Sequence, residues 1–458
     1  MSLSLAIKER ALAAGFDLAG IVLLDALPSS FWDDLSFARR WVAQGYGGEM
    51  HYLENPKRRD PRRILPAVKS VICMGLIYNA PLPYSTEMTE GRKQEAKGRR
   101  QRAEGSNRQE SAQRVSSFEF PVSNFRSPVS NRAWISRYAW GGDYHEVMRT
   151  RLERLRAELH SLAPGVETRV YVDTGPIVER ALARYSGIGW MGKNTCLIDQ
   201  QKGSWFFLGV ILTSVALEPD LPAADRCGSC TRCIEACPTG ALVQPYVMDA
   251  SRCISYFTIE LKGSIPSEFR SAIGRNVFGC DICQDVCPWN SNQWSVVSRQ
   301  LGSSGQASAV SHQPRQIATT DREEFQPLQV RLTRPPNVET TGGSPVESAV
   351  SLFNPSLEAL ADLSEEDFKR IFSRSPIKRA KYRGWLRNLC VVMGNSGDTR
   401  FVPWLERTCG HADAVVREHA AWALHRLQGT GNSKKKRAGR PHVPGSLPIP
   451  CSLACDRT

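Results

Sequence analysis

Eight cysteines between residues 227 and 287 constrain the fold of this chain more than any other feature. The first string is Cys227-Gly-Ser-Cys230-Thr-Arg-Cys233-Ile-Glu-Ala-Cys237-Pro238, which has the C-x2-C-x2-C-x3-C-P spacing of bacterial ferredoxins. The second is Cys280-Asp-Ile-Cys283-Gln-Asp-Val-Cys287-Pro288, which lacks one cysteine of that pattern, and Cys253 can supply it. Eight thiolates are enough for two [4Fe–4S] clusters, so the sequence predicts a protein that moves single electrons.

The spacing also predicts which thiols share a cluster. In a two-cluster ferredoxin run, the first three cysteines bind one cluster and the fourth, before proline, binds the other. This exchange would keep the two clusters close together, as electron transfer requires. We therefore expect two ligand sets, with Cys227, Cys230, Cys233 and Cys287 around one cluster and Cys237, Cys253, Cys280 and Cys283 around the other.

Other uses of these thiols fit the sequence less well. Paired C-x2-C units also suit structural zinc, but neither the four-cysteine run nor its Cys-Pro ending is expected of a zinc ribbon. Residues 1–10 predict the start of an amphipathic helix rather than a signal peptide. We therefore expect a cytoplasmic protein with reduced thiols rather than disulfides. No cluster role is expected for the remaining cysteines, Cys73, Cys196, Cys390, Cys409, Cys451 and Cys455.

Length and charge narrow the class of protein further. A chain of 458 residues is expected to form two or three domains. It has no apolar run of about eighteen residues, so we expect no membrane span. The net charge of +13 predicts a polyanionic partner. The alternative is that the excess positive charge lies in segments without structure and says little about the folded surface.

Three tracts have compositions that cannot bury enough apolar surface to offset the entropy of ordering. We expect an insertion at about 84–130, a linker at about 293–350 that is broken only near Phe325, and a basic tail at 430–458. The tail carries the run Lys434-Lys-Lys-Arg437, which could also be a nucleic-acid or nuclear signal.

The rest of the chain predicts a multidomain fold with three parts. Strands alternate with helices up to residue 225, which predicts an α/β domain. Residues 226–292 predict a ferredoxin-like α+β module, and residues 351–429 predict a HEAT-like helical segment. Two helical units are too few for a solenoid, so this segment must pack against the module. The expected strands of the first domain are 18–24, 68–78, 169–173 and 205–213, and its expected helices are 6–14, 145–162 and 177–185.

Motifs spread along these parts resemble those of one enzyme family. They are Ile135-Ser-Arg-Tyr-Ala-Trp-Gly-Gly-Asp-Tyr-His145, Tyr171-Val-Asp-Thr-Gly-Pro-Ile-Val-Glu-Arg180, Gly189-Trp-Met-Gly-Lys-Asn194, Arg252-Cys-Ile-Ser-Tyr-Phe-Thr-Ile-Glu260 and Arg387-Asn-Leu-Cys-Val-Val-Met-Gly-Asn395, together with both cysteine strings. In this order they resemble the epoxyqueuosine reductases, which are cobalamin-dependent iron–sulfur enzymes of tRNA modification. The resemblance covers most of the chain outside the three tracts.

The resemblance implies a function for the two electrons that the clusters would supply. The first domain would bind cobalamin, and the nearer cluster would reduce it to cob(I)alamin. The enzyme would then reduce epoxyqueuosine to queuosine at the wobble position of tRNA, the final step of queuosine synthesis, with two protons consumed and water released. The hard chemistry would belong to the cobalt, while the protein positions the cofactor and supplies protons.

Several site residues follow from the resemblance. Asp173 would donate a proton, for which it would need a raised pKa; the alternative is that Asp173 is a helix N-cap. His145 is assigned no role, because a lone histidine at a helix start is more often a cap or a packing residue. Gly142 stands where the family usually carries Arg. The expected cofactor contacts are Asp173, Ser136, Leu197, Leu208, Ser255 and Glu260, of which the two leucines would serve equally well as core residues.

Basic residues in the C-terminal segment point to the nucleic acid. Few acidic residues interrupt this run, so we expect phosphate contacts that weaken with salt; the alternative is a solvated helical face. The modified base would be extruded from the anticodon loop. We also expect an external electron donor and a monomer. The expected tRNA contacts are Lys378, Arg379, Lys381, Arg383 and Arg387.

Two other classes of protein stay open at this point. A reductive dehalogenase-like enzyme also couples cobalamin to two [4Fe–4S] clusters, but such enzymes are typically exported with a twin-arginine signal, which the sequence does not show. A non-catalytic ferredoxin-type electron carrier would leave most of the N-terminal half without a purpose.

Overall fold

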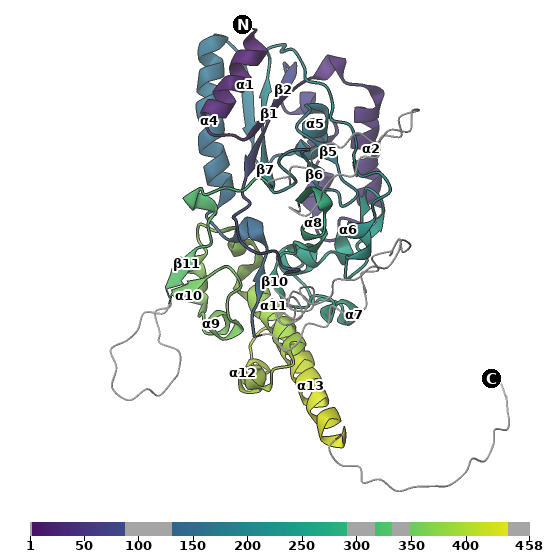
Figure 1. Cartoon of the computed structure of the whole chain (residues 1–458), viewed down its shortest axis with the longest axis vertical. Helices are drawn as coiled ribbons and strands as arrows, with labels where there is room; N and C mark the ends of the chain where they lie inside the picture. The colour runs from purple at the N-terminus through teal and green to yellow at the C-terminus, as the bar shows by residue number, and fades with distance from the viewer. Residues whose placement is uncertain (1, 88–130, 291–316, 332–348, 438–458) are drawn as a thin grey trace, which may run out of the picture.

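The computed structural model describes residues 2–87, 131–290, 317–331 and 349–437 (Figure 1). Its first part is built on a four-stranded sheet of order β1–β2–β7–β4, in which all neighbouring strands are antiparallel. The predicted mixture of strands and helices is therefore present. Because the strands are antiparallel, the rule that places ligands at the carboxyl ends of parallel strands does not explain the position of Asp173. The strands are β1 (Leu18–Leu23), β2 (Ser70–Ile77), β7 (Phe206–Thr213) and β4 (Thr168–Tyr171).

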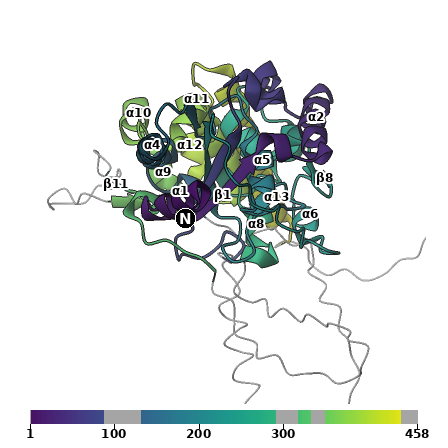
Figure 2. The same ribbon diagram turned by 90° about the horizontal axis from the view of Figure 1, so that it is seen from above.

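Helices cover both faces of this sheet (Figures 1 and 2). On β2, Ile72 and Met74 pack in one core while Val71 and Cys73 pack in the other, because successive side chains of a strand point to opposite faces. This explains why β2 is a continuous apolar run although the sheet is antiparallel. One face carries α1 (Leu3–Ala13) and α4 (Tyr144–Leu162), and the other carries α2 (Ser29–Ala43) and α5 (Glu179–Tyr185).

The cysteine strings lie in a module of short elements below the sheet in Figure 1. Its strand β10 (Asn276–Phe278) pairs in parallel with β3 (Trp134–Ile135), so residues that were expected in the first domain share the core of the module. The predicted boundary at 225 therefore does not separate two cores, because the apolar residues around Trp134 are buried against the module. The other elements are β5 (Trp190–Met191), β6 (Leu197–Ile198), α6 (Arg232–Glu235), β8 (Leu242–Gln244), β9 (Val247–Met248), the π-helical turn η8 (Tyr256–Glu260), α7 (Ser267–Arg270) and α8 (Ile282–Asp285).

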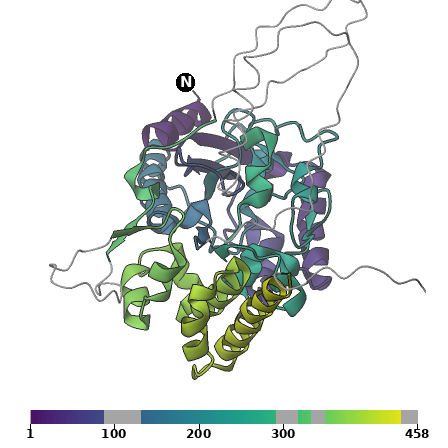
Figure 3. The ribbon, with the colours of Figure 1, turned by 60° about the horizontal axis from the view of Figure 1, so that its bottom comes forward.

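The C-terminal segment is helical, as predicted, and packs against the module (Figure 3). Phe257 and Phe278 of the module share one core with Leu389 and Leu427 of the segment. This contact agrees with the expectation that the segment packs against the module. Its elements are α9 (Leu357–Ala361), α10 (Glu365–Ile371), the 3-10 turn η11 (Pro376–Ala380), α11 (Lys381–Ser396), α12 (Val402–Thr408) and α13 (Ala414–Arg437).

The tracts expected to lack structure are shorter than predicted. The Tyr84 hydroxyl donates to the carbonyl oxygen of Asn290 at 2.6 Å. Arg322 forms an ion pair with Asp17 at 2.8 Å, and Phe325 is buried in the core under α4. Tyr84 thus contacts the cysteine module and residues 322–325 contact the first domain, while β11 (Gln329–Arg331) pairs with β12 (Ala349–Ser351). The remainders of both tracts, 88–130, 291–316 and 332–348, lie outside the described residues.

The expected tail also begins later than predicted. Helix α13 continues to Arg437, through the basic run, because lysine and arginine are good helix formers and their charge is favourable at a helix C-terminus. The rest of the tail lies outside the described residues. Within the part of the chain that the structure describes, no helix is both long and apolar enough to cross a membrane.

Candidate functional site

Asp173 lies in a strained loop between β4 and α5. Its backbone is left-handed, with φ at 55°, which is uncommon for a residue with a side chain. The loop is tight, because a Cβ atom on Gly175 would stand 2.3 Å from the ring of Tyr171. Helix α5 is not capped by Asp173, because the N-cap position is occupied by Val178. The alternative interpretation of Asp173 as a helix cap is therefore wrong, and its carboxylate is available for other contacts.

The Asp173 carboxylate faces two residues from the start of α4. The Tyr144 hydroxyl donates to its Oδ2 at 2.7 Å, and Nε2 of His145 stands 3.8 Å from the same oxygen. His145 is held in turn by Asp143, whose Oδ1 lies 2.7 Å from Nδ1 of the histidine. Lys378 completes the chain, because its ammonium donates to Asp143 at 2.7 Å. Positive and negative side chains thus alternate from Lys378 in η11 through Asp143 and His145 to Asp173.

Neighbouring charged and polar residues set the protonation state of Asp173. Burial raises the pKa of Asp173, but the positive charge of His145 and the hydrogen bond from Tyr144 outweigh burial and hold that pKa at about 2. Burial alone would lower the pKa of His145, yet the carboxylates of Asp143 and Asp173 raise it to about 9. At neutral pH the proton therefore resides on the imidazole and Asp173 is ionised. The expectation of a raised pKa at Asp173 is wrong for this arrangement, because the imidazolium of His145 and the hydroxyl of Tyr144 stabilise the carboxylate more than burial destabilises it.

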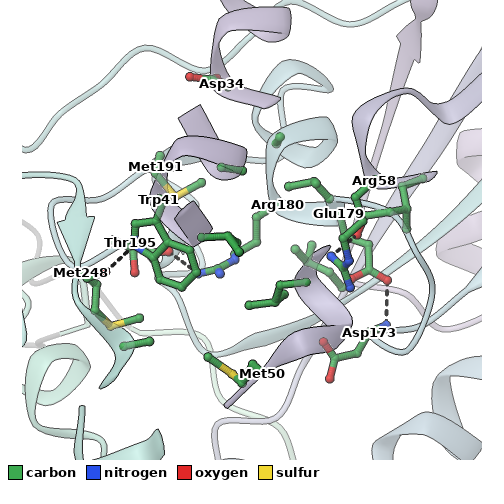
Figure 4. A pocket seen from close by; sticks show the side chains of 18 of the residues that line it. Asp34, Trp41, Met50, Arg58, Asp173, Glu179, Arg180, Met191, Thr195 and Met248 are labelled. Carbon is green, nitrogen blue, oxygen red and sulfur yellow. Dashed lines mark hydrogen bonds between the residues drawn. The ribbon is translucent and has the colours of Figure 1, made fainter. Parts of the chain in front are cut away.

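Glu179 holds a second proton close to Asp173. Its Oε1 accepts a hydrogen bond from the backbone N–H of Asp173 at 2.7 Å (Figure 4). Burial, and then the charge of Asp173, raise the pKa of Glu179 to about 8. Glu179 is therefore mainly protonated at neutral pH. The loop thus lies between two proton carriers, the imidazolium of His145 and the carboxylic acid of Glu179.

A cavity of about 1390 Å³ opens in front of Asp173. This exceeds the roughly 300–1,000 Å³ of most small-molecule sites, so it suits a large cofactor or substrate. Asp173, Glu179 and Met50 line the cavity (Figure 4). The expected cluster ligand Cys253 and the apolar Phe206 also contribute to its walls. One cavity therefore connects the proton carriers to the cysteine module.

Three of the five other expected cofactor contacts lie at this cavity. Leu208, Ser255 and Glu260 line it, the last two on or next to η8. Ser136 does not, because its buried hydroxyl donates to Asp281 at 2.5 Å behind the wall. Leu197 is also absent from the lining and packs in the core under α5, which fits the alternative reading of this leucine as a core residue.

The cysteines are free thiols that gather in two places. Burial, and then the neighbouring Cys230 and Cys227, raise the pKa of Cys233 to about 11. Burial, and then Cys233, raise the pKa of Cys287 to about 12. In the second place, burial raises the pKa of Cys280, and so do Cys253 and Cys237. A hydrogen bond with Cys196 raises the pKa of Cys283, and burial and the charges of Cys280 and Cys253 also raise it. Mutual repulsion of this kind is relieved when thiolates bind a cationic metal centre.

The two thiol groups differ in how deeply their surrounding residues are buried. Among the described residues, no group of three or more His, Cys, Asp or Glu side chains converges closely enough to hold a single metal ion. Cys237 also accepts a hydrogen bond from the backbone N–H of Ala241 at 3.3 Å, which stabilises a thiolate. The first string lies among exposed neighbours such as Ser229, whereas Asp281 and Ile282 in the second string are buried.

The basic residues expected to contact tRNA have unequal environments. Arg379 forms a bidentate ion pair with Glu260, and Arg383 pairs with Asp413 at 2.7 Å. Lys381 is exposed at the start of α11. Arg387 is only 2% exposed and donates to the carbonyl oxygens of Leu261, Gly263 and Phe257. Arg387 is therefore not a phosphate contact, because its donors already bind the loop that follows η8.

Sequence reasoning missed the roles of other residues in and around the cavity. His145 and Tyr144 belong to the quoted Asp-Tyr-His motif, which was the available signal. A second signal was the basic run 55–63, which forms the short turns η3 (Pro56–Arg59) and η4 (Pro61–Arg63). Within it, Arg58 donates to the carbonyl oxygens of Gly175 and Ile177, and Arg59 is exposed at the cavity wall. Arg39 of α2 lines the same wall and is also exposed.

Comparisons with known proteins agree with this geometry. The family described as "4Fe-4S double cluster binding domain" matches residues 226–290, and the family described as "Epoxyqueuosine reductase QueG, DUF1730" matches residues 58–174. An epoxyqueuosine reductase of Xanthomonas campestris is 34% identical over 91% of this chain and 94% of its own length. The corresponding protein of Escherichia coli K12 is 32% identical over 91% of this chain and 88% of its own length.

Solved structures extend the similarity to the fold. A crystal structure of epoxyqueuosine reductase with an epoxyqueuosine-modified tRNA-Tyr stem loop is similar with a TM-score of 0.65 and 28% identity, over 95% of this chain and 93% of that chain. A selenomethionine-labelled epoxyqueuosine reductase gives a TM-score of 0.66 and 27% identity, over 96% and 95%. Fold and cysteine module together define an iron–sulfur oxidoreductase. More particularly, the chain belongs to the epoxyqueuosine reductase family.

Proposed function

We propose that this protein reduces epoxyqueuosine to queuosine in tRNA, with electrons from two [4Fe–4S] clusters and cobalamin as the cofactor. The observation that carries this proposal is the cavity of about 1390 Å³ with Cys253 on one wall and Asp173 on another. Electrons and protons would thus arrive at one space from separate sides. Membership in the epoxyqueuosine reductase family supports the reaction and its substrate.

The two thiol groups would hold the clusters. Cys227, Cys230, Cys233 and Cys287 would bind the first, and Cys237, Cys253, Cys280 and Cys283 the second; the mutual influence of the thiols within each set supports this assignment. The first string lies among exposed residues and would accept electrons from an external donor. Cys253 lines the cavity, so the second cluster would pass them on to the bound cofactor.

The size and the lining of the cavity support cobalamin as its occupant. The walls are mainly apolar, and Leu208, Ser255 and Glu260 would contact the cofactor where η8 and β7 meet the space. When bound and reduced, cobalamin supplies a strongly nucleophilic cobalt centre that takes its electrons one at a time. The residues of this chain would exclude water, orient the cofactor and deliver protons.

The loop that carries Asp173 would transfer the protons that the reaction consumes. Reduction of an epoxide to an alkene takes two electrons and two protons, and one water leaves. His145 and Glu179 each hold a proton at neutral pH, and each lies beside Asp173. We propose that Asp173 passes the proton of His145 to the epoxide oxygen and that Glu179 supplies the second proton, so that the oxygen leaves as water. Tyr144, bonded to Asp173 at 2.7 Å, would orient the carboxylate.

The tRNA would approach across the basic rim of the cavity. Arg39 and Arg59 are exposed, line the cavity and have no carboxylate partner among the described residues, so they can bind phosphate without breaking an ion pair. Lys378, Arg379 and Lys381 would contribute from the helical segment, although Lys378 and Arg379 would first exchange their present carboxylate partners. The modified base would leave the anticodon loop, where unstacking is cheap, and enter the cavity.

The rim contacts can be tested by the salt dependence of tRNA binding. Replacing both Arg39 and Arg59 by Ala should weaken binding and lower the slope of log K against log salt by about 1 to 2, since each phosphate contact contributes roughly 0.7 to 0.9. The matched control replaces Arg149 and Arg154, two exposed arginines on the outer side of α4, and should leave the slope unchanged. An equal effect of both pairs would mean that only net charge matters.

The reaction itself is tested with purified components. Protein reconstituted with iron, sulfide and cobalamin is incubated with a reductant and tRNA that carries epoxyqueuosine, and the nucleosides are then separated by mass spectrometry. We expect queuosine to appear only when both cobalamin and the reductant are present. Unchanged epoxyqueuosine with a fully loaded protein would refute the proposed function.

A further inference from the structure

The tight turn between β5 and β6 contacts both cysteine strings. The Gly192 N–H donates to the Cys196 carbonyl oxygen at 2.8 Å and closes the turn. Lys193 lies within it, and its ammonium donates to the carbonyl oxygens of Gly228 at 2.6 Å and Cys230 at 3.0 Å, both in the first string. The next residue, Asn194, donates from its amide to the carbonyl oxygen of Cys283 at 3.2 Å, in the second string.

The charge of Lys193 lacks a carboxylate partner. Its side chain is buried, with 9% exposed, and no ion pair to it occurs among the described residues. Two carbonyl oxygens offset only part of the cost of burying an ammonium group, so a negative charge is needed nearby. The cysteines of the first string are expected to supply it as thiolates, because both carbonyl oxygens that Lys193 binds belong to that string.

We propose that Lys193 positions the cluster held by the first cysteine string and raises its reduction potential. This inference rests on the cluster assignment made above. The ammonium would supply the counter-charge for the thiolates, and a fixed positive charge beside a cluster stabilises the form that carries one electron more. Reduction adds one electron from the external donor, and no bond is made or broken.

The same turn would hold the two clusters in fixed positions relative to the cavity. Asn194 is 3% exposed and anchors the second string, so one rigid turn joins both strings. Its next residue, Thr195, has a left-handed backbone with φ at 62° and lines the cavity, and its carbonyl oxygen accepts a hydrogen bond from Arg180 at 2.6 Å (Figure 4). Lys193 would therefore adjust the reduction potential of the first cluster, and it lies on a turn that also bounds the cavity proposed for the cofactor.

The test is a redox titration of the reconstituted full chain, followed by electron paramagnetic resonance. In Lys193→Met we expect one of the two cluster midpoints to become more negative by about 59 mV, which is a tenfold less favourable one-electron reduction. The other midpoint should change much less. Lys193→Arg, which keeps the charge, should stay near the unsubstituted protein. Lys262→Met removes an exposed lysine of the same module and serves as the control for net charge.

Each outcome decides the inference. Unchanged midpoints in Lys193→Met, in a protein that retains both clusters, would overturn it and leave the proposed function intact. If Lys193→Met loses the first cluster, retention of about eight irons by Lys193→Arg supports the role of the charge, and equal loss in both variants overturns it. An unsubstituted protein without any iron–sulfur signal would overturn both the inference and the proposed function.

Discussion

Replacing Asp143 by Asn tests whether His145 supplies the proton. Two carboxylates raise the pKa of His145 from 6.5 to about 9, which corresponds to roughly 3 kcal/mol in favour of the imidazolium. Asp143 is the nearer, at 2.7 Å from Nδ1, against 3.8 Å between Nε2 and Asp173. Removing its charge should therefore lower the pKa of His145 by about 1 to 2. Asn keeps the cap of α4 that Asp143 provides, so the helix should remain in place.

The assay is the single-turnover rate of queuosine formation as a function of pH. His145 donates only when protonated, so the rate of the unsubstituted protein should fall as the pH rises through about 9. In Asp143→Asn the same decline should begin about 1 to 2 pH units lower. Lys378→Met, which removes the ion pair to Asp143 without touching His145, should move the decline much less. A decline that stays near pH 9 in Asp143→Asn would show that the proton does not come from His145.

Further predictions concern stability and proton supply. Arg387→Met removes the donor of three carbonyl oxygens, of which that of Phe257 is buried, and should cost roughly 3 kcal/mol in unfolding free energy by chemical denaturation; an unchanged midpoint would contradict the buried position. The pKa of His419 is lowered to about 4 by burial, so stability should be complete above pH 6.5 and decrease by up to about 3 kcal/mol as the pH falls to 4. His419→Gln should flatten that dependence, and an unaltered pH profile would exclude His419 as its cause. Glu179→Gln removes an acid whose pKa is about 8 and should slow turnover without weakening cobalamin binding, as measured by absorbance titration.

Local sequence patterns predicted the framework of the fold. The apolar run of β2 and the helical spacing of α4 are short-range features, so their bounds differ from the predicted ones by only one or two residues. The pairing of β3 with β10 was missed, because two short strands far apart in sequence leave no periodic signal. Helix α2 was missed as well, since only Phe31 and Leu35 of its residues are buried and its apolar stripe is correspondingly narrow.

The site was predictable in its residues but not in its electrostatics. Asp173 followed from its motif, yet its low pKa depends on Tyr144 and His145, which reach it only through the packing of α4 beside β4. The role expected of Arg387 was wrong for a related reason. A basic run does not reveal which side of α11 faces solvent, and Arg387 lies on the side that packs against the module.

The most direct test of the central claim compares three proteins loaded equally with cobalamin: the unsubstituted chain, Asp173→Asn and Cys253→Ala. Nucleoside mass spectrometry then measures queuosine formed from epoxyqueuosine-containing tRNA in the presence of a reductant. Electrons and protons are proposed to meet in the cavity that Cys253 and Asp173 both line. We therefore predict that the unsubstituted chain converts the tRNA and that each variant binds it but forms little queuosine. Full conversion by either variant would contradict the account.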